Sequence, residues 1–98
     1  MTINKQQNGS VLTIAVQGRL DTTTAPDLEK EIKTGLDGVT ELIMDFEKLD
    51  YISSAGLRVL LSAQKTMSRQ GSMKVVHVSD RVMEVFAVTG FTDILTID

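Results

Sequence analysis

The apolar residues of the first third of the chain recur at a spacing of two and then at a spacing of four. Leu12, Ile14 and Val16 alternate with Val11, Thr13 and Ala15, which predicts a strand with both faces at least partly covered. Asn8-Gly9 just before it is a strong hairpin signal, because both residues tolerate positive φ. Short apolar runs of the same kind predict strands at Thr2–Gln6, Val11–Gln17, Glu41–Phe46 and Met73–Val78.

The intervening segments have the helical period. Leu28, Ile32 and Leu36 follow Pro26 at intervals of four, which predicts an amphipathic helix that begins near this proline and ends at Asp37-Gly38. The same reasoning predicts a helix over Gly56–Gln70 and a third from Asp80 to Gly90, with a turn through Glu47–Asp50 and a short strand or helical turn in Phe91–Ile97. The order β-β-α-β-α-β-α implies parallel strands with crossover helices. We therefore expect a single α/β domain over residues 1–98, with a mixed β-sheet packed against its helices.

Composition narrows the possible functions. The chain has 98 residues, 42% of them apolar, and a net charge of −3 without any Lys/Arg cluster, which argues against nucleic acids and anionic membranes as partners. It has no cysteine and one histidine, so disulfides and thiol chemistry are excluded. The apolar stretches are too short to span a bilayer, and the N-terminus lacks the apolar core of a signal peptide. A cytoplasmic domain is expected.

Candidate catalytic residues are few. His77 is predicted to lie within a strand, on the same face as Val75, and no nucleophile stands at a recognisable spacing from it. Asp21, Asp45 and Asp50 fall at or near strand ends, where open α/β sheets collect functional groups, although each of them also fits a solvated turn. No glycine-rich phosphate loop is present. We expect no enzymatic site, no metal and no cofactor.

The stretch DYISSAGLRVLL at residues 50–61 places two serines where a helix begins. In one interpretation, Ser53 or Ser54 is an N-cap whose oxygen accepts a free N–H, which contributes about 1 kcal/mol. In the other, a serine at a helix N-terminus is a phosphorylation site, because free N–H groups and the helix dipole favour a phosphate there. Small Ala55 and Gly56 would leave the hydroxyl open to a kinase. The pattern of residues is compatible with both.

The longer stretch LIMDFEKLDYISSAGLRVLL resembles the signature of STAS domains, specifically the free-standing bacterial anti-sigma factor antagonists. The upstream GRLDTTTAPDLEKEI is similar to the family's Gly-x-Leu-Asp turn and first helix, so the resemblance covers essentially the whole chain. It implies that Ser54 is the phosphate acceptor, followed by the small residue Ala55 and the family's Gly-Leu pair at Gly56. Ser53 stands where the family usually has Asp, and it is a second hydroxyl that could itself be modified.

The resemblance implies a non-enzymatic switch. The unphosphorylated protein would bind an anti-sigma factor, usually a serine kinase, and phosphorylation would end that binding until a PP2C-type phosphatase restores it. Asp21 would help to position the serine for phosphoryl transfer, with Asp45 and Asp50 as weaker candidates at the same end. The partner surface is expected on the helix face that bears Arg58, Ser62 and Lys65.

STAS domains also serve as non-phosphorylated scaffold subunits in lipid-transport or stress-sensing complexes, an alternative that the Ser53 departure favours. An enzyme is a distant third possibility.

Overall fold

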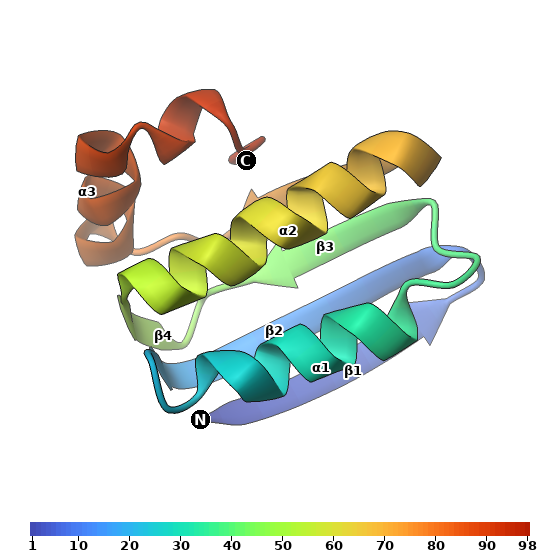
Figure 1. The fold of residues 1–98 in the computed structure, drawn as a ribbon, viewed down its shortest axis with the longest axis horizontal. Helices are drawn as coiled ribbons and strands as arrows, with labels where there is room; N and C mark the ends of the chain where they lie inside the picture. Colours follow the sequence, from blue (N-terminus) through green and yellow to red (C-terminus); the bar gives the residue numbers. More distant parts are fainter.

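The computed structural model describes residues 1–98 and contains a five-stranded mixed sheet (Figure 1). β1 (Thr2–Asn8) and β2 (Val11–Leu20) form an antiparallel hairpin, and Gly9 between them has the positive φ that the hairpin prediction requires. β2 pairs in parallel with β3 (Glu41–Asp45), which pairs in parallel with β5 (Ser72–Val76). The predicted mixed sheet with parallel crossovers is confirmed.

One strand was not predicted. The segment Leu49–Ile52 forms β4, which pairs in parallel with the end of β2; the expectation of a turn reaching to Asp50 is wrong. The pairing is possible because β2 has a bulge at Gly18, whose φ is +100° and whose N–H donates to the Lys48 carbonyl at 2.9 Å. The first half of β2 thus pairs with β3, and its last residues pair with β4.

The helices lie mainly on one face of this sheet. α1 (Ala25–Gly35) and α2 (Ser54–Gln70) lie in front of the strands in Figure 1, and α3 (Asp80–Thr89) lies at the end beside β4. The chain then forms a short 3-10 helix at Phe91–Asp93, and Ile97 forms a bridge to Val75. Both expectations for the C-terminal segment are therefore partly met. None of the helices is long and apolar enough to cross a membrane.

Burial follows the alternation that the sequence displays. Leu12, Ile14 and Val16 of β2 are buried under the helices. The residues between them, Val11, Thr13 and Ala15, are half-buried on the other face of the sheet. The helices and the residue after α1 contribute apolar side chains to one core of 24 residues, among them the predicted Leu28, Ile32 and Leu36, and also Leu57, Leu60, Met67, Val82 and Phe86.

Candidate functional site

The start of α2 lies where β2 and β4 end side by side. Leu20, the last residue of β2, is in register with Ile52, the last residue of β4. The Ser53 N–H donates to the Leu20 carbonyl at 2.9 Å and extends this pairing by one residue. Asp21 and Ser53 are consequently the first residues beyond two paired strand ends, and Ser54 opens the helix directly after them.

The two serines differ in environment. Ser54 is the first residue of α2 and is exposed. Ser53 precedes the helix in an extended conformation, and its carbonyl accepts the Leu57 N–H at 2.9 Å. Its Oγ, however, is buried and has no hydrogen-bond partner. No side chain caps this helix, so the interpretation of Ser53 or Ser54 as a side-chain N-cap is wrong. In α3, by contrast, the Ser79 Oγ does accept the Val82 N–H, at 3.3 Å.

The N-terminus of α2 is open to an anion. The N–H groups of Ser54, Ala55 and Gly56 donate no hydrogen bond within the protein, and the first turn contains no acidic residue. Gly56 is buried against Leu20 and Ile52, which fixes the start of the helix on the sheet. Free N–H groups and the positive end of the helix dipole favour negative charge at this position.

Asp21 belongs to a turn of its own at this edge. Its Oδ1 accepts hydrogen bonds from the Thr23 hydroxyl at 2.7 Å, the Thr23 N–H at 3.0 Å and the Thr24 N–H at 3.2 Å. These bonds, that of the Thr23 hydroxyl first, lower the pKa of Asp21 below its usual 3.8 against an opposing effect of desolvation. Arg19, which lies 4.2 Å from the centroid of the Tyr51 ring, adds a weak ion pair at 3.7 Å. Asp21 is thus an ionised carboxylate beside Ser53.

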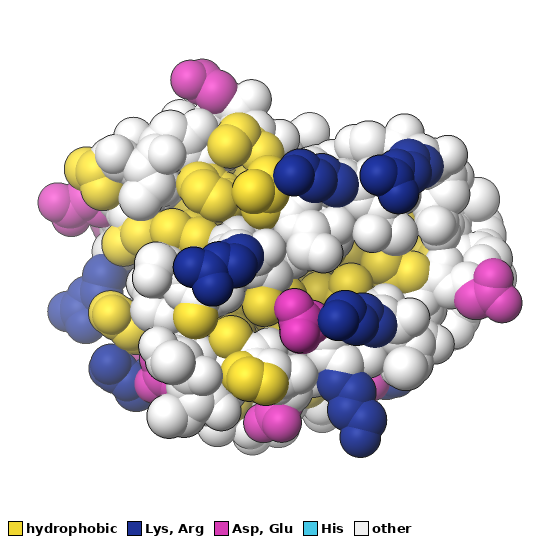
Figure 2. Space-filling model, in the orientation of Figure 1, with side chains coloured by type: hydrophobic (Ala, Val, Ile, Leu, Met, Phe, Trp, Pro, Cys, Tyr) yellow, Lys and Arg dark blue, Asp and Glu magenta, His cyan; other side chains and the backbone are white.

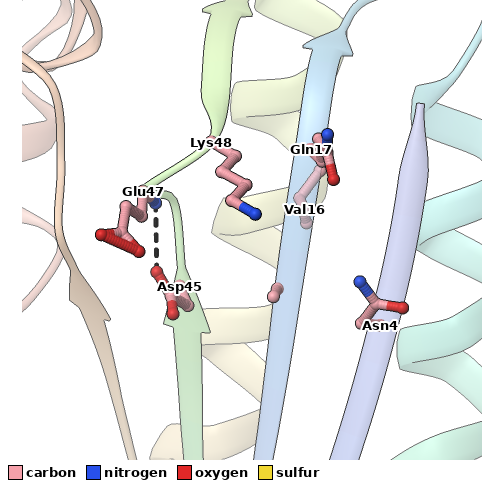
Figure 3. A pocket seen from close by; sticks show the side chains of 7 residues that line it. Asn4, Val16, Gln17, Asp45, Glu47 and Lys48 are labelled. Carbon is pink, nitrogen blue, oxygen red and sulfur yellow. Dashed lines mark hydrogen bonds between the residues drawn. The ribbon is translucent and has the colours of Figure 1, made fainter.

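Asp45 interacts with a different set of residues. At the end of β3 its Oδ1 accepts the Glu47 N–H at 3.0 Å (Figure 3), and it lies 3.0 Å from Nδ1 of His77. Partial burial disfavours the ionised form of Asp45, but these contacts together lower its pKa, and in return the hydrogen bond and the charge of Asp45 raise the pKa of His77. Asp50 lies exposed within β4.

The position of His77 corrects a prediction. It follows β5 rather than lying within it, its φ is +57°, and its side chain is 60% exposed. It therefore does not share a face with Val75, which is completely buried. The His77–Asp45 pair could not be predicted, because the two residues are 32 positions apart and no sequence pattern links them.

The same edge also brings together three side chains that could hold a metal ion. One ligand atom each of Asp45, Glu47 and His77 lies within 4.8 Å of the others. Glu47 and His77 are exposed, and the Asp45–His77 hydrogen bond already satisfies that pair without a cation. The neighbouring pocket between β1, β2 and β3 holds Asn4, Gln17 and Lys48 (Figure 3) and is lined by no serine, threonine or cysteine. It therefore offers no hydroxyl or thiol nucleophile.

The outer face of α2 is cationic. The side chains expected at the partner surface, those of Arg58, Ser62 and Lys65, are all exposed on it. The helix contains three basic residues, Arg58, Lys65 and Arg69, and no carboxylate; none of the three forms an ion pair. Lys and Arg side chains are spread over the face that carries α1 and α2, with apolar atoms exposed between them (Figure 2).

A shallow depression separates α1 from α2 beside Ser54. Arg58 and Ala55 line it from α2, while Pro26 and Glu29 line it from α1. The side chain of Glu29 is the only carboxylate in the depression, and its Oε1 lies 3.8 Å from Nζ of Lys33. The start of α2 therefore combines an exposed hydroxyl, free N–H groups and an unpaired guanidinium.

Comparison with known proteins places this arrangement in a family. The model of the STAS domain matches residues 2–98. The chain is 33% identical over 99 residues to BtrV, a candidate anti-sigma factor antagonist of Bordetella bronchiseptica, and covers 85% of it; 99% of this chain is aligned. It is 26% identical over 98 residues to the anti-sigma-B factor antagonist of Bacillus subtilis, covering 99% of this chain and 90% of that protein.

The fold is also that of solved structures. The anti-sigma factor antagonist SpoIIAA in its unphosphorylated form superposes with a TM-score of 0.85 at 21% identity, over 99% of this chain and 88% of that one. Its phosphorylated form from Bacillus gives a TM-score of 0.77 at 20% identity, over 99% and 91% of the two chains. The relatives are regulators rather than enzymes by name. The family match over nearly the whole chain, together with these relatives, shows that the protein belongs to the STAS domain family.

Proposed function

We propose that this protein is an anti-sigma factor antagonist, a partner switch controlled by phosphorylation of Ser54. Unphosphorylated, it binds an anti-sigma factor that is itself a serine kinase, and so makes a sigma factor available for transcription in the cytoplasm. The kinase transfers a phosphate to Ser54 and is released, and a PP2C-type phosphatase returns the protein to its binding form.

The observation that carries the proposal is the contrast between the two serines. The Ser54 side chain is exposed at the first position of α2, whereas the Ser53 Oγ is buried and unpartnered. A kinase needs an accessible hydroxyl, so Ser54 is the acceptor in this proposal and Ser53 is not. Asp21 supports the assignment as an ionised carboxylate that follows β2 next to Ser53.

The partner surface in this proposal is the face of α2 with Arg58, Ser62 and Lys65. Three unpaired cations and no carboxylate make α2 complementary to an acidic surface, although the chain as a whole has a net charge of −3. Such complementarity favours the encounter and fixes the orientation of the partner. With the partner on this face of α2, Ser54 would lie at the edge of the interface.

Phosphorylation then acts through charge. A phosphoserine adds about −1.5 to −2 charges to a helix that carries three cations, and it places a strongly hydrated group where the partner must make contact. Desolvation of this group and repulsion from an acidic partner oppose binding. A penalty of about 3 kcal/mol would weaken binding more than about a hundredfold.

The test combines phosphate mapping with binding. The purified chain is incubated with ATP and each serine-kinase anti-sigma factor encoded in the same genome, and the modified residue is identified by mass spectrometry. We expect phosphate on Ser54. Ser54→Ala should bind the kinase as the wild type does and stay bound in ATP, while Ser54→Asp should bind it at least tenfold more weakly.

Ser72→Asp is the matched control. Ser72 is exposed at the start of β5, beyond the other end of α2. The substitution therefore introduces the same charge away from the proposed interface, and the variant should bind the kinase like the wild type. Phosphate on Ser53, or equal binding by Ser54→Asp and the wild type, would contradict the proposal.

A second candidate is a scaffold subunit that is never phosphorylated. It is favoured by Ser53, which stands where the resemblance leads us to expect an aspartate. The absence of phosphate with every encoded serine kinase would favour this candidate.

A further inference from the structure

The unpaired guanidinium of Arg58 has a defined place relative to Ser54. The two residues are four positions apart in α2, and both are exposed. Residues at this spacing lie on the same face of a helix, with their Cβ atoms about 5–6 Å apart. The extended side chain of an arginine covers that distance, so its guanidinium can reach a group attached to the Ser54 oxygen.

Nothing in the protein competes strongly for Arg58. It forms no ion pair, and the one carboxylate that shares its depression, Glu29, lies within 4.0 Å of Lys33 instead. At the other end, Asp21 is held by Thr23 and Thr24. The first turn of α2 contributes three free N–H groups and no carboxylate.

We propose that Arg58 pairs with the phosphate of phosphorylated Ser54 within the same chain. Phosphate and guanidinium form bidentate, charge-assisted hydrogen bonds, and the pair is oriented along the helix so that the anion lies near the N-terminus, as the dipole favours. This inference rests on the proposed function, because it concerns the phosphorylated form of Ser54.

The pairing adds a second element to the switch. Arg58 is one of the cations on the face of α2 that we assign to the partner. When it binds the phosphate, it is no longer available to an acidic group of the partner. Phosphorylation thus introduces a negative charge and at the same time withdraws a positive one from the interface.

The test uses the full chain with phosphoserine incorporated at position 54 by an expanded genetic code, so that no kinase is required. The second pKa of the phosphate, about 6 for a free phosphoserine, is measured by ³¹P NMR titration. We expect this pKa to be lower in the wild type than in Arg58→Gln by about 0.3 pH unit or more. Arg58→Lys should give an intermediate value.

Lys65→Gln is the matched control, because it removes the same charge from the same helix face 11 residues from Ser54, about 16 Å along the axis. Beyond the screening length of about 8–10 Å, it should leave the pKa close to the wild-type value. Equal values in Arg58→Gln and the wild type, or an equal effect of Lys65→Gln, would overturn the inference. Phosphorylation of another residue by the kinase would instead overturn the proposed function and leave this result standing.

Discussion

Gly56 sets how closely α2 approaches the sheet, and replacing it by alanine should destabilise the protein. A Cβ at this position would lie 2.7 Å from Cγ of Leu20 and 2.8 Å from Cγ1 of Ile52. Carbon atoms in contact are normally about 3.5–4.0 Å apart. Both neighbours are buried, with exposures of 0% and 2%, so neither can move aside without disturbing the ends of β2 and β4.

The magnitude is the difference between two effects. Inserting a methyl group into a well-packed core costs about 1–3 kcal/mol, while the change from glycine to alanine favours the helix by about 0.8–1.0 kcal/mol. Because the added Cβ would clash with two buried side chains at once, we take the cost at the upper end of this range, about 2–3 kcal/mol, and expect the free energy of unfolding of Gly56→Ala to fall by about 1–2 kcal/mol. For a domain of this size, that corresponds to a drop in Tm of roughly 4–16 °C.

Gly35→Ala provides the control. Gly35 ends α1, and a Cβ there would meet only Cδ2 of Leu12, at 4.0 Å. Without a clash, the substitution should raise the stability by about 0.4–1 kcal/mol. Urea unfolding followed by circular dichroism measures both variants, and the argument from close packing would fail if Gly56→Ala were as stabilising as Gly35→Ala.

Two further predictions concern side-chain contacts. Ser79→Ala should lower the free energy of unfolding by about 1 kcal/mol, because the Ser79 Oγ accepts the Val82 N–H. Ser53→Ala should be neutral or stabilising, because it removes a buried hydroxyl without a hydrogen-bond partner. A comparable loss of stability in both variants, measured by urea unfolding, would refute the distinction. The wild type should be more stable than His77→Gln at about pH 5.5 but not at about pH 9. The raised pKa of His77 contributes stability that is complete below the usual value of 6.5 and is lost as the pH rises through the pKa of His77 in the folded protein. The lowered pKa of Asp45 ends this advantage again in acid, as the pH falls through its folded value below 3.8, and a difference between the two proteins that is independent of pH would exclude the ion pair.

The predictable parts of the fold are those with a regular period. The strand at Val11–Gln17 and the helix with Leu28 and Ile32 are predictable because their apolar residues recur every two residues in the strand and every four in the helix, and burial in the structure follows the same periods. β4 lacks such a signal, since its buried residues Leu49 and Ile52 are three apart and it has only four residues. It exists because Gly18 allows a bulge in β2, a feature of pairing between distant segments.

The candidate site was predictable to the level of the motif but not of the individual hydroxyl. The sequence placed both serines at the start of a helix, and it left open which of them is buried. Which serine is buried depends on the exact residue at which the strand ends and the helix begins. α2 begins at Ser54 rather than at Gly56, and the Ser53 N–H continues the pairing of β4 with β2. The extended Ser53 then directs its Oγ into the protein, where no donor or acceptor meets it.

The arrangement of α2 separates the residues that hold the helix from those that we assign to the switch. Gly56, Leu57, Leu60 and Met67 are buried against the sheet, and their packing does not depend on the charge of Ser54. Ser54, Arg58 and Lys65 lie on the exposed side, where a change of charge alters the surface without altering the core. A phosphate at Ser54 can thus change which partner binds while the same fold persists, and substitutions on the two sides of one helix should affect stability and binding separately.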